Sequence, residues 1–391
     1  MNKKAVSMGT IIAVSCTWFG IHAGGGFASG AQTMSFLTRY GKWSLVTPLI
    51  TVALMAVMFR ELIIMAKNHN TFDFRSLSIE LYKPYDKIMA PIYEVCIVVA
   101  SVVAVSSCVA GGATVLRNYL GVNYGAGIVL IGFVMLILAI FGAKLVARAN
   151  TLMSVIIVAA VFIIAVIALS NGKAHLGEYL ASPHASQTPV GFALLKSISY
   201  TGFQAYSFGG LLGVSYVLKT SKNISIMLII GFVINGIMLW LTSFVMLAYM
   251  PEAGTQSGVA TLPLYYVCQS SGQQFLMVVY IVALLAAYIS TGVGVIFGFV
   301  KRYIRIVLAK KPDANVPVSN FIIGAIFIVL TVGAATFGLT RIVNIGFGYM
   351  GYVGMVTVFL PTVIAGHIKN RKFAAEHPTF DEENLAKDIK G

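Results

Sequence analysis

The sequence predicts an all-α integral membrane protein of about ten transmembrane helices, built as two five-helix repeats of inverted orientation. Three observations support this fold class. Hydrophobic residues make up 58% of the 391 and charged residues only 10%, whereas a soluble domain carries about 25% charged residues. Apolar runs long enough to cross a ~30 Å hydrocarbon core recur along the chain. Two of these runs are interrupted by glycine-rich stretches centred near Gly24 and Gly209.

The apolar runs divide the chain into one polytopic domain and a tail. The ten predicted helices lie at roughly 8–37, 43–60, 88–115, 124–143, 150–169, 190–218, 223–249, 273–300, 317–336 and 342–366. The transmembrane domain spans 1–368, with repeat one at about 8–169 and repeat two at about 190–366. Residues 369–391 form a polar cytoplasmic tail that we expect to be mobile. Since five is odd, the second repeat must enter the membrane from the opposite side.

Two shorter stretches carry their own expectations. The charged segment between the second and third predicted helices contains four aromatic residues, which favours a cytoplasmic amphipathic helix. In the last predicted helix, four glycines between 346 and 354 indicate close packing or a bend.

The formal net charge of +14 sets topology and does not indicate nucleic-acid binding. With a cytoplasmic N-terminus, 21 of the 27 Lys and Arg residues fall on the inside, which fits the positive-inside rule with both termini cytoplasmic. We therefore expect a multi-pass protein of the cell membrane. The six basic residues on the outside are Arg39, Lys42, Arg117, Lys173, Lys196 and Arg341.

The first interruption, Gly20–Gly30, contains five glycines. Irregular backbone at mid-membrane persists only where it is buried in protein or lines a cavity, and secondary transporters bind their solutes at such breaks. The amides of Gly24, Gly25 and Gly26, at the start of the second half-helix, favour an anionic group such as a carboxylate. The alternative is that the glycines allow tight helix packing.

His22 lies within this first interruption, where an ionisable side chain is a functional hypothesis by default. A neutral, hydrogen-bonded His22 could shape the pocket. Direct solute contact or proton coupling is the alternative, because histidine titrates near neutral pH.

The second interruption runs from Ser199 to Gly213 and mixes polar with aromatic side chains. Such a lining suits a small zwitterion with an apolar side chain, although aromatic rings can also enclose a quaternary ammonium or simply pack in the core. The candidate solute-binding residues here are Ser199, Tyr200, Phe203, Gln204 and Tyr206.

The eighth predicted helix carries adjacent hydroxyls in Ala287-Tyr-Ile-Ser290-Thr291. These side chains can bond back to their own helix, or they can join backbone carbonyls to coordinate a hard cation, which prefers oxygen ligands. Neither interruption contains a carboxylate. Glu94, inside the third predicted helix, is expected to pair with Arg60 or to line the cytoplasmic exit; a proton relay is the alternative.

The ten-helix inverted repeat with its first and sixth helices broken resembles the LeuT fold of the amino acid–polyamine–organocation superfamily. The segment Gly-Gly-Gly-Phe-Ala-Ser-Gly is similar to that of bacterial YkvI-type permeases. This resemblance implies one Na⁺ site, formed by Gly20, Ala23, Ala287, Ser290 and Thr291. A second site is not expected, because carriers with two use an asparagine where this chain has Phe27.

We therefore expect a secondary active transporter of a small organic solute, with an amino acid as the first candidate, driven by Na⁺ symport. A proton-coupled or uncoupled carrier of a betaine-like organocation, or a transporter-like membrane sensor, are the alternatives. No nucleophile–base pair or metal cluster is evident, so an enzyme is not expected. No cofactor beyond Na⁺ is expected, and the partners are the solute and the lipid bilayer. The oligomeric state is left open.

Overall fold

The computed structural model describes residues 6–141, 143–170, 175–255, 262–272 and 274–387. Within these ranges the chain forms helices and loops without a strand, which confirms the all-α prediction. Seven of the described helices are long and apolar enough to cross a membrane, and two shorter apolar helices accompany them at Met8–His22 and Ile156–Ser170. Of the six basic residues predicted outside, Lys173 lies beyond the described residues.

The helices follow the predicted order. Those of the first half are α1 (Met8–His22), α2 (Gly25–Ala28), α3 (Ala31–Phe36), the 3₁₀ segment η1 (Thr38–Leu45), α4 (Thr47–His69), α5 (Phe74–Tyr82), α6 (Asp86–Leu120), α7 (Tyr124–Phe141) and α8 (Ala143–Ser170). Among them, α5 occupies the segment predicted to be an amphipathic helix.

The second half begins after a short connection formed by α9 (Leu176–Ala181) and the 3₁₀ turn η2 (Pro183–Ser186). Its helices are α10 (Val190–Gln204), the 3₁₀ turn η3 (Ala205–Ser207), α11 (Phe208–Ser215), α12 (Ser221–Leu247), α13 (Glu252–Thr255), α14 (Pro263–Ser270), α15 (Gln274–Lys310) and α16 (Val316–Ala335).

The last long helix is one run, Leu339–Glu376, whose winding changes along its length. It comprises α17 (Leu339–Arg341), η4 (Ile342–Phe347), α18 (Gly348–Gly354), η5 (Met355–Phe359), η6 (Thr362–Gly366) and α19 (His367–Glu376), with η4, η5 and η6 wound as π-helix. A short helix, α20 (Phe380–Lys387), follows. The glycines predicted to give a bend or close packing lie in this π-rich part.

Several helices continue beyond the predicted apolar ends. The second predicted helix ended at 60, but α4 extends to His69, and the eighth ended at 300, but α15 extends to Lys310. Hydropathy marks only the part of a helix suited to hydrocarbon, whereas helical hydrogen bonding continues into charged sequence. Glu61 therefore lies inside α4 and is buried.

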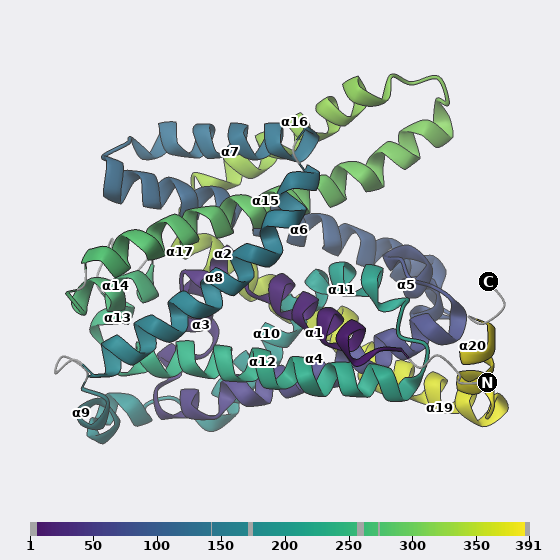
Figure 1. The fold of residues 1–391 in the computed structure, drawn as a ribbon, viewed down its shortest axis with the longest axis horizontal. Coiled ribbons are helices and arrows are strands. Elements are labelled where there is room, and N and C mark those ends of the chain that lie inside the picture. Colours follow the sequence, from purple (N-terminus) through teal and green to yellow (C-terminus); the bar gives the residue numbers. More distant parts are fainter. Residues whose placement is uncertain (1–5, 142, 171–174, 256–261, 273, 388–391) are drawn as a thin grey trace.

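The helices form two packed groups (Figure 1). In one group α12 packs on α1 and α4, and α10 packs on α4 and α18. In the other, α15 packs on α6, α7, α8 and α16. The first group is close-packed at α1, because a Cβ on Gly231 would lie 2.2 Å from the Trp18 ring, and the Ser15 hydroxyl donates to the carbonyl of Met227 at 2.8 Å. The broken segment α1–α2 bridges the groups, since α2 contacts α15.

The polar tail is folded, not free, over its described part. Helix α20 lies toward the end of the molecule from which α1 starts (Figure 1). The carboxylate of Asp381 accepts hydrogen bonds from buried Lys67 of α4 and from the backbone N–H of Ser221, at the start of α12. Burial opposes ionisation, but these hydrogen bonds outweigh it and hold the pKa of Asp381 below its ordinary value. The tail therefore ties together two helices of the first group.

Of the two predictions for Glu94, the pair with Arg60 is wrong, and a position at the cytoplasmic exit stays a prediction. Glu94 pairs with Arg302 of α15 at 2.9 Å, whereas Arg60 pairs with its neighbour Glu61 at 2.8 Å. Only the short helix α5 separates α4 from α6 in the chain, but Arg60 and Glu94 face different neighbours. The Glu94–Arg302 pair instead joins α6 to α15.

Candidate functional site

The first interruption is a true break in helical winding. Helix α1 ends at His22 and α2 begins at Gly25. Ala23 leaves the helical region with φ −80° and ψ 38°, and Gly24 is extended with ψ 179°. The N–H of Ala23 still bonds to the carbonyl of Phe19 at 2.7 Å, which closes the last turn of α1. The prediction of a discontinuous first helix is confirmed.

This break exposes backbone hydrogen-bonding groups in the middle of the protein. Within the described residues, the carbonyls of Gly20 and Ala23 accept no backbone N–H, and the N–H groups of Gly24 and Gly26 have no backbone acceptor. Each such group costs free energy in a dry interior unless a partner is supplied. The break therefore offers both acceptors and donors to a bound species.

The glycines at the break allow neighbouring side chains to approach the backbone. A Cβ on Gly25 would lie 2.2 Å from Cδ1 of Tyr288, and one on Gly26 would lie 2.4 Å from Nε2 of Gln32. No residue with a side chain fits such contacts unless these neighbours move. Glycine is required here by close approach as well as by the unwound backbone.

Thr291 of α15 lies directly at the break. The N–H of Gly25 donates to Thr291 Oγ1 at 3.3 Å, and a Cβ on Gly24 would lie 3.2 Å from the same oxygen. The hydroxyl of the adjacent residue, Ser290, donates to the carbonyl of Ala287, about one turn earlier, at 3.2 Å. Two predicted ion ligands, Ser290 and Ala287, are thus hydrogen-bonded to each other within α15, while Thr291 contacts the backbone at the start of α2.

His22 is buried and hydrogen-bonded at both ring nitrogens. Its Nδ1 lies 2.8 Å from Oδ1 of Asn235 and its Nε2 lies 2.9 Å from the hydroxyl of Tyr200. The amide nitrogen of Asn235 donates to the carbonyl of Gly231, so its oxygen must accept from His22. Nδ1 then carries the hydrogen, Nε2 accepts from Tyr200, and the neutral imidazole is fully paired.

Two members of this buried cluster carry roles that sequence reasoning did not assign. Asn235 of α12 is buried, and its side-chain oxygen anchors the imidazole. Gln32 of α3 is buried, and its Oε1 lies 3.5 Å from the hydroxyl of Tyr200. The signal for Gln32 was available, because an amide inside an apolar run needs a partner in a membrane protein.

The second interruption is milder than the first. The chain changes from α-helix to a 3₁₀ turn at Ala205–Ser207, yet Gln204 keeps φ −68° and ψ −18°, and Ser207 keeps φ −80° and ψ −12°. The hydroxyl of Ser207 donates to the carbonyl and the amide oxygen of Gln204, at 2.7 and 3.1 Å. The sixth helix is therefore interrupted by tightening of one turn, not by unwinding.

The candidate solute residues of α10 point in two directions. Tyr200 faces His22, as described above. Ser199 and Phe203 face the Leu339–Glu376 helix, where the Phe203 ring stacks on Phe347 at 4.2 Å and a Cβ on Gly351 would lie 2.4 Å from Ser199 Oγ. The Ser199 hydroxyl is buried without a hydrogen-bond partner within the described part of the chain.

Tyr206, within the 3₁₀ turn, also faces the last long helix. Its hydroxyl lies 3.2 Å from Oγ1 of Thr357, and its ring stacks on Tyr93 of α6 at 6.3 Å. Only Tyr200 of the α10 candidates therefore hydrogen-bonds to a residue at the first break. Phe36 of α3 connects the two directions, because its ring lies 5.1 Å from Tyr200 and 6.4 Å from Phe203.

No protein-family model matches this chain, and no curated protein matches it either. Solved structures do match. The inward-facing conformation of Mhp1 has a TM-score of 0.60 at 12% identity, covering 90% of this chain and 76% of Mhp1. MhsT in complex with L-phenylalanine has a TM-score of 0.57 at 16% identity, covering 99% of each chain. Closed Mhp1 with bromovinylhydantoin bound, described as a nucleobase-cation-symport-1 family transporter, has a TM-score of 0.55 at 12% identity, covering 96% of each chain.

These matches establish the fold. The chain is an all-α, multi-pass membrane protein of the LeuT fold, as its sequence predicted, and the similar structures are membrane transporters, not enzymes. At 12–16% identity the likeness extends to the fold alone. The count of ten crossings, the YkvI-type resemblance, and the solute and ion sites stay predictions.

Proposed function

We propose that this protein is a Na⁺-coupled symporter of a small amino acid, with solute and ion bound at the break between α1 and α2. The observation that carries the proposal is the unwound backbone at Ala23–Gly24, with unpaired carbonyls and amides enclosed by protein. A membrane protein keeps such groups unpaired at a cost, and a bound ion and solute would remove that cost. Both termini would face the cytoplasm.

The ion would be held between the break and α15. The free carbonyls of Gly20 and Ala23 and the hydroxyl of Thr291 supply oxygen, the ligand atom that hard cations prefer. Ser290 and Ala287 would add two further oxygens once the Ser290 hydroxyl turns from its own helix toward the ion.

The solute carboxylate would bind the free amides of the break. Gly24 and Gly26 have N–H groups without a backbone acceptor, and glycine lets a carboxylate approach the chain closely. Aromatic rings from α3 and α10 lie beside this point, which suits an apolar side chain. MhsT, of similar fold, is described with L-phenylalanine bound. The proposed solute site comprises His22, Gly24, Gly25, Gly26, Ser199, Tyr200, Phe203, Gln204 and Tyr206.

Uptake into proteoliposomes tests the proposal directly. Purified protein is reconstituted and offered labelled amino acids, betaine and purines under an inward Na⁺ gradient, with a K⁺ gradient as control. We expect Na⁺-dependent accumulation of at least one apolar amino acid. Accumulation of betaine alone would favour the organocation carrier, and an absence of uptake across the panel would favour a sensor.

Replacement of Thr291 with alanine tests the ion site. Thr291→Ala should raise the Na⁺ concentration for half-maximal uptake about tenfold, because one charge-assisted oxygen contact is lost, and Thr291→Ser should retain function. Thr331→Ala is a matched control: Thr331 is buried, but its hydroxyl donates within α16 to Ile328, away from the break. Equal sodium dependence in both alanine variants would remove Thr291 from the ion site.

A proton-coupled carrier is the second candidate, and it rests on His22. A protonated His22 would donate from Nε2 to the Tyr200 oxygen, and Tyr200 would then donate to Gln32. Uptake driven by an inward proton gradient without Na⁺, and lost in His22→Gln, would support this candidate. Sodium-driven uptake that is insensitive to the proton gradient would exclude it.

A further inference from the structure

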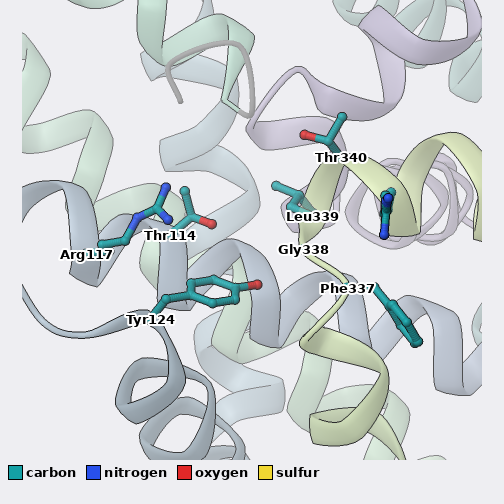
Figure 2. A pocket seen from close by; sticks show the side chains of 8 residues that line it. Thr114, Arg117, Tyr124, Phe337, Gly338, Leu339 and Thr340 are labelled. Carbon is teal, nitrogen blue, oxygen red and sulfur yellow. The ribbon is translucent and has the colours of Figure 1, made fainter. Parts of the chain in front are cut away.

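A surface cavity lies at the C-terminal end of α6, outside the proposed transport site. The Glu94–Arg302 pair lies toward the other end of the same helix. The cavity measures about 270 Å³ and lies where α6 ends, α7 begins, and the connection from α16 enters the last long helix. Figure 2 shows Thr114, Arg117 and Tyr124 on one side and Gly338, Leu339 and Thr340 on the other. The eight lining residues are Thr114, Arg117, Tyr124, Phe337, Gly338, Leu339, Thr340 and Arg341.

The cavity is positively charged without compensation. Two of its lining residues, Arg117 and Arg341, carry guanidinium groups and none is acidic. Within the described part of the chain, neither arginine has an ion-pair partner. Arg117 lies over the face of Tyr124, 5.6 Å from the ring centroid, which fixes one guanidinium at the cavity wall. Guanidinium groups bind phosphate and carboxylate in a planar fork.

Backbone donors line the same cavity. Gly338, at φ 83°, precedes the 38-residue helix Leu339–Glu376 and supplies no side-chain cap. The first N–H groups of this helix, at Leu339 and Thr340, have no backbone acceptor within the described residues. Two other polar groups are already engaged: the Tyr124 hydroxyl donates to Ala335, and the Thr114 hydroxyl donates to Ala110. Apart from the Thr340 hydroxyl, which can donate or accept, the unpaired side-chain and N–H groups named here are donors, which favours an anion.

The surroundings indicate where such an anion would come from. Leu120, three residues after Arg117 at the end of α6, is 71% exposed, and Phe337, in the cavity wall, is 65% exposed. Large apolar side chains at the ends of membrane helices lie at the boundary between hydrocarbon and water, where arginine side chains also reach lipid headgroups. A ligand that presents a phosphate to the donors of the cavity and acyl chains to the exposed apolar side chains fits both features of this surface.

We propose that this cavity is a binding site for a phosphate group, supplied by the headgroup of an anionic phospholipid. Arg117 and Arg341 would hold the phosphate from opposite walls, with the N–H groups of Leu339 and Thr340 as further donors. Free inorganic phosphate has the same chemistry and is the alternative source. The site is separate from the break in α1 and does not depend on the transport mechanism.

Lipid titration of the full-length protein tests this site. The protein in detergent is titrated with dioctanoyl phosphatidylglycerol, dioctanoyl phosphatidylcholine and, separately, inorganic phosphate. Native mass spectrometry counts the bound molecules, and the shift in melting temperature measures how far each ligand protects the protein. Arg117→Gln/Arg341→Gln should weaken phosphatidylglycerol binding about tenfold or more, since charge-assisted hydrogen bonds are lost. Arg39→Gln/Lys42→Gln removes two exposed charges predicted on the same side and should leave binding unchanged.

A second variant guards against an effect on folding. Thr340→Glu keeps both arginines, changes an exposed residue, and should abolish binding by repelling the phosphate. Binding of phosphatidylglycerol but not inorganic phosphate assigns the site to lipid, and equal protection by both assigns it to the free anion. The proposal is overturned if neither probe binds the unmodified protein above the level of phosphatidylcholine, or if the cavity variants bind like the Arg39/Lys42 control.

Discussion

The two glycine-rich interruptions look alike in the sequence but differ in structure. At the first, the chain leaves helical geometry at Ala23 and Gly24, and its backbone groups are open to a ligand. At the second, Gln204 through Ser207 stay in the helical region and only tighten into a 3₁₀ turn. A run of glycines in a membrane helix therefore marks either an unwound backbone or a locally tightened helix, and hydropathy does not distinguish the two.

What the glycines contact explains the difference. Gly25 and Gly26 lie under the side chains of Tyr288 and Gln32. Gly202 instead lies against the backbone of Gly351 and Gly354, so that α10 and α18 meet chain to chain. The first set shapes a site, and the second set brings two helices into contact, as small residues do in membranes.

The largest effect is expected at Gly202. A Cβ there would lie 2.3 Å from the carbonyl oxygen of Gly351 and 2.4 Å from the amide of Met355, and backbone atoms in packed helices cannot move aside. Gly202→Ala should therefore destabilise the protein by about 3 kcal/mol or more, measured by thermal unfolding in detergent. Gly213→Ala is the control, because no atom lies within 4 Å of its Cβ position.

A small effect of Gly202→Ala, equal to that of Gly213→Ala, would break the comparison. It would mean that α10 and α18 separate readily, so that the glycines of the second interruption do not serve to bring two helices into contact.

The sequence predicted the first break well because its signal is local. Five glycines within Gly20–Gly30, with His22 among them, have few other uses in hydrocarbon. The second interruption could not be interpreted in this way, because the role of Gly202 depends on Gly351 and Gly354, about 150 residues later. The Asn235–His22 bond and the Glu94–Arg302 pair likewise join distant segments. The predicted Glu94–Arg60 pair failed for this reason.

The next largest loss of stability is expected at Gly25, whose added Cβ would collide with a side chain, whereas that of Gly202 would collide with backbone. Gly25→Ala should cost about 2 kcal/mol, because its Cβ would meet the Tyr288 ring at 2.2 Å. In a Tyr288→Ala background, which lacks the colliding Cγ, Cδ1 and Cε1 atoms, the same substitution should cost little. A double-mutant cycle on thermal stability measures this coupling. No shortened side chain should rescue Gly202→Ala in the same manner. Additive losses at Gly25 and Tyr288 would show that the tyrosine is not the obstacle.

The polar cluster behind the first break gives a smaller effect. Asn235→Ala leaves Nδ1–H of His22 buried without an acceptor and should cost about 2 kcal/mol, whereas Tyr200→Phe removes one donor and should cost about 1 kcal/mol. Thr242→Ala controls for the loss of a buried polar group on α12, because its hydroxyl bonds only within its own helix, to Met238. Equal melting temperatures for the three variants would show that the hydrogen bonds of His22 to Asn235 and Tyr200 do not stabilise the protein as proposed.

The smallest effect is expected at Gly210, where the two interruptions touch. A Cβ on Gly210 would meet only Cδ1 of Ile21 at 2.8 Å and Cγ1 at 3.2 Å, and the end of an isoleucine side chain can turn away. Alanine also favours the helix over glycine by about 0.8 kcal/mol, so Gly210→Ala should change stability by less than about 0.5 kcal/mol. Its neighbour Gly209 is the sharper control, because a Cβ there would lie 1.8 Å from the Phe74 ring of α5. A loss at Gly210 as large as that at Gly209 would mean that Ile21 is fixed by the break it adjoins, and that the first interruption is rigid well before its unwound residues begin.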